Sequence, residues 1–266
     1  MKLFPSLLIF ILFFSNSLMG QESVNPKLEK DSIIPNQNIV ELNARIESMH
    51  RWRGNASSDR PTITGTLKVN LDKNKKWQMG IWGASAISNE TSGVHYKEID
   101  YFITYQVTPK FSLGIWDQFP MKNQINPNIF DYNQYSTKHY IDLEMIYYFG
   151  DQFPLRLQSD IALYGNDFET DAFGKKTRLY STYIEGLYRM ITTPKMRFGP
   201  LLGIGMSFQG NSMGYGNGKG NFNVVNVGFM AVRKVKVSNW QFPVTGVAFW
   251  NPSQKIARVQ ISANLF

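Results

Sequence analysis

The sequence contains no cysteine. This absence excludes disulfide bonds, thiolate metal sites and lipid attachment through an N-terminal cysteine. Beyond residue 20 the sequence also lacks any apolar run near the ~18 residues that a membrane-spanning helix needs. A fold without cross-links and without such a helix must bury or cover its apolar residues in another way.

Residues 1–20 have the composition of a secretory signal peptide. Lys2 supplies a positive charge, and residues 7–14 form an apolar run that is too short to span a bilayer. Leu18-Met19-Gly20 precede the expected cleavage point at Gln21. We therefore expect a cleaved signal peptide over residues 1–20, a flexible N-terminal segment over 21–36 and a folded part over 37–266.

The stretch 62–71 alternates almost without fault between apolar and polar residues. Ile63, Leu67 and Val69 share one face of an extended chain, whereas Thr64 and Lys68 share the other. The same alternation recurs along the chain and predicts about twelve strands. We place these strands at residues 38–50, 62–71, 77–88, 97–107, 110–118, 138–149, 155–163, 178–190, 196–209, 222–232, 240–250 and 256–266.

The connections between these segments alternate between short turns and longer loops, which is typical of outer-membrane barrels. Every predicted strand has an apolar face, yet no helical segment exists to cover these faces, and lipid can do so. We predict an all-β fold, a transmembrane antiparallel up-and-down β-barrel in the bacterial outer membrane. Phe266 supports this prediction because such barrels often end in an aromatic residue, although it is out of phase with Leu265.

Aromatic residues make up 14% of the chain, and several lie beside the predicted short turns. An amphipathic ring is well placed at a lipid–water boundary, so this row predicts an interfacial girdle. Rim packing in a soluble barrel is the alternative interpretation. The row consists of Trp77, Phe111, Phe149, Phe153, Phe198 and Trp240.

Three short motifs follow the first predicted strand: Arg53-Gly54, then Gly80-Ile81-Trp82-Gly83-Ala84-Ser85, then Glu98-Ile99-Asp100-Tyr101. In these motifs the chain resembles the TorF-type porin family, over about residues 40–110. The resemblance implies an outer-membrane barrel that conducts small solutes. It does not imply a particular substrate.

The histidines and the glycine-rich stretch are the candidates for catalytic or ligand-binding motifs. Lipid hydrolases with a barrel fold pair a His with a Ser two residues later, and none of His50, His95 and His139 has this arrangement or metal-ligand spacing. We expect surface or rim roles for the three histidines. The glycine-rich stretch 210–220 lacks the residues of a phosphate-binding loop and is predicted to be a flexible outer loop. The sequence therefore predicts no enzyme, catalytic residue, cofactor or metal.

Charged residues on the faces opposite the lipid are the best functional indication. Charges at membrane depth are costly unless they pair or line water. They either neutralise each other in a filled barrel or flank a narrow aqueous path. The predicted lining residues are Glu41, Arg45, Glu47, Lys68, Glu98, Asp100, Asp142, Glu144, Arg156, Asp160, Glu185, Arg189, Arg197 and Arg258.

These observations favour passive diffusion of small polar solutes through a narrow charged lumen. The alternatives are a closed structural or loop-presenting barrel and, third, a lipid-modifying barrel enzyme. The formal net charge of +8 suggests attraction to anionic lipid, and export makes nucleic acid an improbable partner. The expected partners are outer-membrane lipid, the solutes and, during biogenesis, the barrel-assembly machinery.

Overall fold

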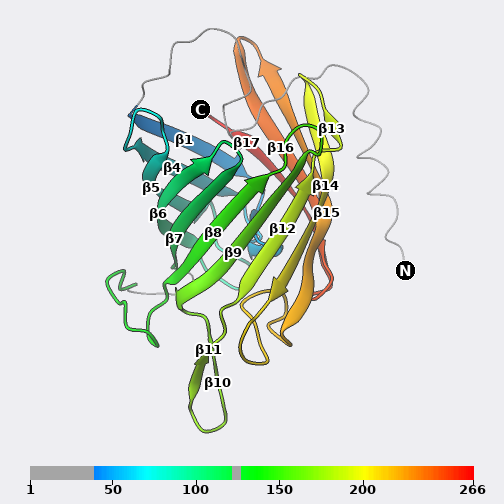
Figure 1. Cartoon of the computed structure of the whole chain (residues 1–266). Helices are drawn as coiled ribbons and strands as arrows, with labels where there is room; N and C mark the ends of the chain where they lie inside the picture. The colour runs from blue at the N-terminus through cyan, green and yellow to red at the C-terminus, as the bar shows by residue number, and fades with distance from the viewer. Residues whose placement is uncertain (1–38, 122–126) are drawn as a thin grey trace, which may run out of the picture.

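A computed structural model describes residues 39–121 and 127–266 (Figure 1). The predicted signal peptide and the predicted segment 21–36 lie outside the described residues, as does the start of the first predicted strand. In the described ranges, no helix is long and apolar enough to cross a membrane.

Twelve antiparallel strands form a closed barrel, because each strand pairs with its neighbour in sequence and β1 pairs with β17. All twelve predicted strands are confirmed in order. They are β1 (Val40–Glu47), β4 (Thr62–Asn70), β5 (Trp77–Ala86), β6 (Lys97–Thr108), β7 (Phe111–Pro120), β8 (Tyr140–Tyr148), β9 (Leu155–Gly165), β12 (Thr182–Tyr188), β14 (Met196–Met206), β15 (Phe222–Val237), β16 (Trp240–Asn251) and β17 (Ile256–Asn264).

Five short strands lie outside this ring. The pair β2 (His50–Trp52) and β3 (Asn55–Ser58) forms a hairpin in the first connection, and the pair β10 (Phe168–Thr170) and β11 (Lys176–Arg178) forms one in the fourth long loop. The fifth, β13 (Ile191–Thr192), adds to the edge of β14. The β10–β11 hairpin projects from the barrel end at the bottom of Figure 1.

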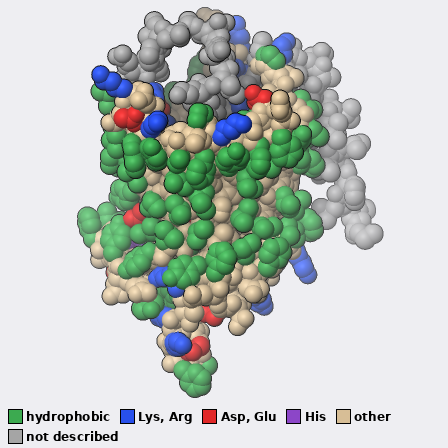
Figure 2. Space-filling view, viewed as in Figure 1, with side chains coloured by type: hydrophobic (Ala, Val, Ile, Leu, Met, Phe, Trp, Pro, Cys, Tyr) green, Lys and Arg blue, Asp and Glu red, His purple; other side chains and the backbone are tan. Residues whose placement is uncertain are grey.

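The alternation read from the sequence sets the two faces of the wall. On β4, Ile63 and Leu67 are exposed on the outer surface, whereas Thr62 and Thr64 are buried inside. Figure 2 shows hydrophobic side chains gathered in a band around the wall, with charged side chains mainly above and below it. The outside is therefore apolar where a bilayer would cover it, and many of the buried polar residues line the interior.

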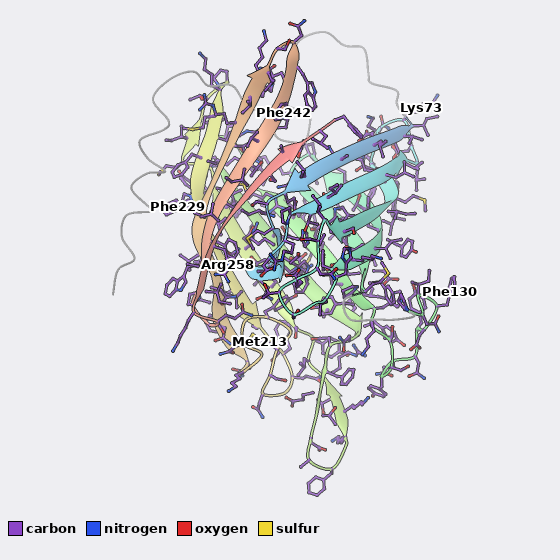
Figure 3. The ribbon with its side chains drawn as sticks, turned by 180° about the vertical axis from the view of Figure 1, so that it is seen from behind. Lys73, Phe130, Met213, Phe229, Phe242 and Arg258 are labelled. Carbon is purple, nitrogen blue, oxygen red and sulfur yellow. The ribbon has the colours of Figure 1, made fainter. Side chains whose placement is uncertain are left out.

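The two ends of the barrel differ as the sequence predicted. Short turns join the strands at one end, marked by Lys73 in Figure 3, and the long loops carry Phe130 and Met213 at the other. Four rings of the predicted girdle are exposed next to the short turns: Trp77, Phe149, Phe153 and Trp240. In the usual orientation of outer-membrane barrels, the short turns face the periplasm and the long loops face outward.

Several strands are shorter than predicted, and two of them for clear local reasons. The first ends at Glu47 because Met49 turns into the barrel and packs there with other buried apolar side chains. The strand predicted over 178–190 begins only at Thr182, since Tyr180 has a left-handed φ of 51° that interrupts extended backbone. Phe266 lies beyond the end of β17 at Asn264, so strand alternation does not set its direction.

Candidate functional site in the barrel lumen

The β2–β3 hairpin of the first outer loop folds into the lumen. Arg53 and Gly54 at its tip both have positive φ angles, of 46° and 81°, which fits the tight turn of a two-residue hairpin. A Cβ on Gly54 would lie 2.1 Å from the backbone oxygen of Val225 in the wall. The side-chain amide of Asn251 donates to the Gly54 carbonyl at 3.1 Å. Only glycine therefore fits at this point of contact.

The hairpin tip is held by Arg53, whose guanidinium reaches the opposite wall. It forms ion pairs with Asp142 on β8 and, at 3.1 Å, with Asp160 on β9. It also donates to the Tyr215 hydroxyl at 2.9 Å and stacks over the Trp52 ring at 4.8 Å. Both carboxylate side chains are fully buried, so the arginine supplies their positive partner inside the barrel.

The loop between β14 and β15 also contributes to the lumen, although the sequence predicted a flexible outer loop here. Met213 and Tyr215 are buried, and Tyr215 hydrogen bonds to the Tyr140 hydroxyl at 2.9 Å. Burial raises the pKa of Tyr215 above its ordinary value. Gly205 makes room for this ring, because a Cβ there would lie 2.9 Å from Tyr215. The glycines of this region thus let the loop pack inward.

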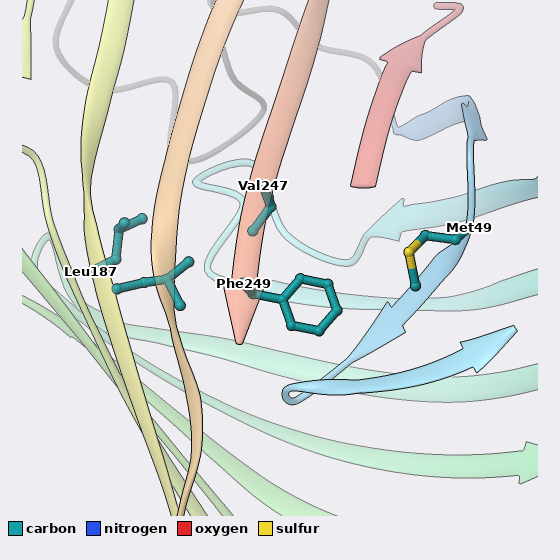
Figure 4. Packing of buried hydrophobic residues seen from close by; sticks show 5 residues of the cluster. Met49, Leu187, Val247 and Phe249 are labelled. Carbon is teal, nitrogen blue, oxygen red and sulfur yellow. The ribbon is translucent and has the colours of Figure 1, made fainter. Parts of the chain in front are cut away.

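A small apolar cluster fixes the base of the hairpin to the wall. Met49 packs with Leu187, Leu201, Val247 and Phe249, all of them buried (Figure 4). These four partners come from β12, β14 and β16, on the side of the lumen away from Trp82 and Glu98. The hairpin is therefore attached by apolar contacts at its base and by ion pairs at its tip.

Among the described residues, two sizeable chambers lie beside the hairpin in the lumen, and charged side chains line both. The larger, about 390 Å³, lies against β1, β4, β16 and β17, and the smaller, about 270 Å³, lies against β5 to β9 and β12. His50, Arg51 and Trp82 line both chambers. These three side chains therefore lie between the two chambers.

The predicted lining residues differ in depth and in burial. Arg156, Arg189 and Arg197 lie beside the short turns, and Arg258 is exposed near the opposite end of the wall. Buried in the lumen are Glu47, Glu98, Asp100, Asp142, Asp160 and Glu185. Partly buried are Glu41, Arg45, Lys68, Glu144, Arg156, Arg189 and Arg197.

Some of these charges pair with each other. Lys68 Nζ lies 2.8 Å from Glu41 Oε2, and Arg45 Nε lies 3.2 Å from Glu47 Oε1. Carboxylates that face the smaller chamber also receive neutral donors. Glu185 accepts from the Tyr183 hydroxyl at 2.6 Å, and Glu144 accepts from the Trp116 indole at 3.2 Å.

Sequence reasoning missed the two cations that matter most in this arrangement. Arg51 and Arg53 follow the regular alternation of the first predicted strand. The alternation therefore could not show whether their side chains point inward or outward. Arg51 lies 3.8 Å from Glu185, and Arg53 binds the two aspartates described above. The Arg53-Gly54 dipeptide was the available signal, because an arginine beside an obligatory turn glycine indicates a defined hairpin tip.

The three histidines have different environments. His50 lies in the lumen and contacts Glu47 at 2.9 Å, so the surface role expected for it is wrong. His139 is also buried, beneath the outer loop that follows β7, and contacts Asp117 at 2.6 Å. His95 lies in the loop between β5 and β6, which agrees with the rim position expected for it. Within residues 39–121 and 127–266, no group of three or more His, Asp or Glu is arranged to hold a metal ion.

Comparison with known proteins gives only distant similarities. No protein-family model matches the chain, and no curated protein matches it in sequence. A NanC porin structure aligns with 84% of this chain and 98% of its own, at 10% identity and a TM-score of 0.44. A bacterial polysaccharide outer membrane secretin aligns with 86% and 98%, at 9% identity and a TM-score of 0.37. No functional statement follows from values this low.

Proposed function

We propose that this chain is a porin-like barrel of the bacterial outer membrane. The apolar band on its outside supports a location in lipid, because a soluble protein would leave this large surface in contact with water. The sheet closes on itself through β1 and β17, which pair over three residues, and closure is the arrangement that a membrane-spanning sheet requires.

We further propose that small polar solutes cross this barrel passively through a narrow charged path. The observation that carries this proposal is the pair of polar chambers that meet at His50, Arg51 and Trp82. Charged side chains line both chambers, and buried charges at membrane depth are favoured where they face water. The hairpin would then narrow the lumen rather than fill it.

A closed barrel is the second candidate, and one observation favours it. The hairpin tip is bound at three points, to Asp142, Asp160 and Tyr215, so the lumen is partly filled by a fixed element. Such a barrel would serve as a structural or loop-presenting protein with no transport.

Single-channel recording from the refolded mature chain in a planar bilayer distinguishes these candidates. A porin-like path predicts stable conductance steps whose ion selectivity changes when Glu98 or Asp100 is replaced by its amide. A silent bilayer would favour the closed barrel, provided that folding and insertion are shown independently by heat-dependent mobility on a gel and by protection from protease.

A further inference from the structure

A serine, a histidine and an asparagine form a connected row at the outer end of β5. The Ser85 Oγ and the His95 Nε2 are 3.3 Å apart, and the His95 Nδ1 lies 2.9 Å from the Asn89 Oδ1. The three residues come from the end of β5 and from the loop that joins it to β6. This row is independent of the lumen, and the proposed channel does not use it.

The order of the three groups is that of a nucleophile, a general base and a residue that orients the base. The Asn89 carbonyl oxygen accepts from His95 Nδ1–H, which leaves Nε2 as the acceptor for the Ser85 hydroxyl. The Ser85 hydroxyl has the Ala86 carbonyl, also at 3.3 Å, as its alternative acceptor. Contacts of this length are common in such sites before substrate binds.

Ser85 lies on the outside of the barrel, not in the lumen. Its alternation on β5 places it on the face of Met79 and Ile81, both exposed, and opposite to the buried Ala84 and Ala86. Trp77 at the other end of β5 belongs to the row beside the short turns. Ser85 therefore stands near the outer boundary of the apolar band, where the ester groups of an outer-leaflet lipid would lie.

The neighbours of Ser85 on this outer face suit an acyl ester. Its register partners are Ile63 on β4, which is apolar and exposed, and Lys97 on β6, which is exposed on the same face. Residues directly opposite each other on paired strands lie within side-chain reach. The Lys97 ammonium can therefore approach a negative charge that develops beside the serine.

Two glycines leave the outer wall without side chains beside the serine. Gly65 and Gly83 are register partners on the outer face, two residues from Ile63 and Ser85. A Cβ on either glycine would meet only one atom, at 3.8 Å, so this part of the wall is open. Leu67 and Ile81 continue the same face as exposed apolar side chains. An acyl chain could lie against this apolar surface with its ester at Ser85.

We propose that Ser85, His95 and Asn89 form a hydrolytic site for the acyl esters of membrane lipids, with Ser85 and His95 as catalytic residues and Asn89 as a positioning residue. The Ser85 oxygen attacks the ester carbonyl as its proton passes to His95 Nε2, and the oxyanion forms beside Lys97. The intermediate collapses as His95 returns the proton to the departing alcohol. Water, activated by the same nitrogen, then cleaves the acyl-enzyme to the fatty acid and restores the serine.

This inference shares only the membrane location with the proposed channel, so the two can fail separately. The test uses the refolded mature chain in detergent micelles, with phosphatidylethanolamine in mixed micelles and a p-nitrophenyl acyl ester as substrates. Fatty-acid or nitrophenol release is measured with the wild type and with Ser85→Ala and His95→Ala. The matched control is Ser92→Ala, an exposed serine of the same loop. Heat-dependent mobility on a gel verifies that every variant is folded.

We expect Ser85→Ala and His95→Ala to lose at least about 10³-fold in kcat/KM while Ser92→Ala keeps the wild-type rate. A fluorophosphonate probe should label Ser85 in the wild type, as located by mass spectrometry, and should label His95→Ala far more slowly. Asn89→Ala should lower kcat about tenfold or more with little change in KM. Asn89→Asp should keep most of the wild-type kcat.

Lys97→Met should lower kcat for both substrates, since the oxyanion is common to both. The proposal is overturned if the folded wild type hydrolyses neither ester faster than Ser85→Ala. It is equally overturned if the probe labels other serines and spares Ser85. If the protein conducts ions but hydrolyses no ester, the hydrolytic site is refuted and the proposed channel stands. If it hydrolyses esters but does not conduct ions, the channel is refuted and the hydrolytic site stands.

Discussion

Arg53 and Asp160 lie 3.1 Å apart in the lumen. Asp160 is on β9, which is six strands from β1 and five from β4 in the twelve-stranded ring, and the hairpin of Arg53 connects β1 and β4. The contact joins the tip of the first outer hairpin to the wall directly opposite its own root. Together with the ion pair to Asp142, it determines how far the hairpin extends into the lumen. Arg53 is therefore the charged anchor of the hairpin tip, beside the apolar contacts at the hairpin base.

Replacing this arginine should widen the path. Arg53→Met leaves Asp142 and Asp160 without their cationic partner, at a cost of about 3–5 kcal/mol if both stay buried and ionised. The hairpin is expected to move out of the lumen so that water reaches both carboxylates. Single-channel conductance should rise and become noisier than in the wild type. Lys73→Met, in an exposed short turn, removes the same charge and should leave conductance unchanged.

Gly54→Ala tests the same contact without changing any charge. A Cβ at this position would lie 2.1 Å from the Val225 oxygen, and the left-handed φ of 81° adds strain. This variant should therefore raise conductance as Arg53→Met does. Wild-type conductance in both folded variants would show that the hairpin does not limit the path.

Four carboxylates and two arginines line the smaller chamber, and this excess of carboxylates predicts a preference for cations. Glu98, Asp100 and Glu144 line this chamber, and among the described residues none of them has a Lys, Arg or His within ion-pair distance. Fixed negative charge attracts cations and repels anions in a narrow path. The reversal potential in a KCl gradient should therefore indicate cation selectivity.

Neutral substitutions should weaken that preference. Glu98→Gln and Asp100→Asn are each expected to lower the permeability ratio of potassium to chloride about twofold or more. Asp151→Asn, in an exposed short turn, is the control and should keep the ratio. An anion-selective wild type would contradict this assignment of the charged wall.

The ring of strands could be predicted from the sequence because alternation is a local property. On β4, Leu67 and Lys68 show their opposite faces without reference to any other part of the chain. The short turns also have local signatures, as at Pro109. The order of neighbours then follows, since a closed up-and-down barrel pairs consecutive strands.

The contents of the lumen could not be predicted in this way. Tyr215 meets Arg53 although 162 residues separate them, and nothing local shows that either enters the barrel. Ser85 and His95 are separated by a loop whose path places them together, so a motif with fixed spacing does not find them. The carboxylates were found because they lie on regular strands, whereas Arg53 and Tyr215 lie outside the strands of the ring.

Asp167 in the fourth long loop predicts a pH effect on the loop structure. It is buried, its Oδ2 accepts from the Ser181 amide at 2.9 Å, and its Oδ1 has no partner among the described residues. Burial raises the pKa of Asp167 above its ordinary value. The folded loop therefore favours the protonated carboxyl more than the unfolded loop does.

The loop should therefore be more stable at low pH. Below the ordinary pKa of aspartate, Asp167 is protonated in the folded and the unfolded loop, and the loop has its full stability. Above that pKa the unfolded loop loses the proton first, so the stability of the folded loop falls as pH rises. Proteolysis within residues 166–181 should accordingly be slower at about pH 4 than at about pH 7. Asp167→Asn should abolish most of this difference in proteolysis rate between the two pH values, whereas the control Asp131→Asn should keep it. If Asp167→Asn keeps the difference as well, another group causes the pH effect.

The inner and outer faces of β4 should tolerate charge differently. Leu67 is exposed on the outer face near the middle of β4, whereas Lys68 points inward to Glu41. Leu67→Arg should reduce the free energy of folding in lipid by about 2–4 kcal/mol, because a charge then faces the hydrocarbon. Lys68→Ala should cost less than about 1 kcal/mol, since its ion pair is partly solvated. A denaturant titration in lipid vesicles measures both, and equal costs would mean that the faces of β4 are assigned wrongly.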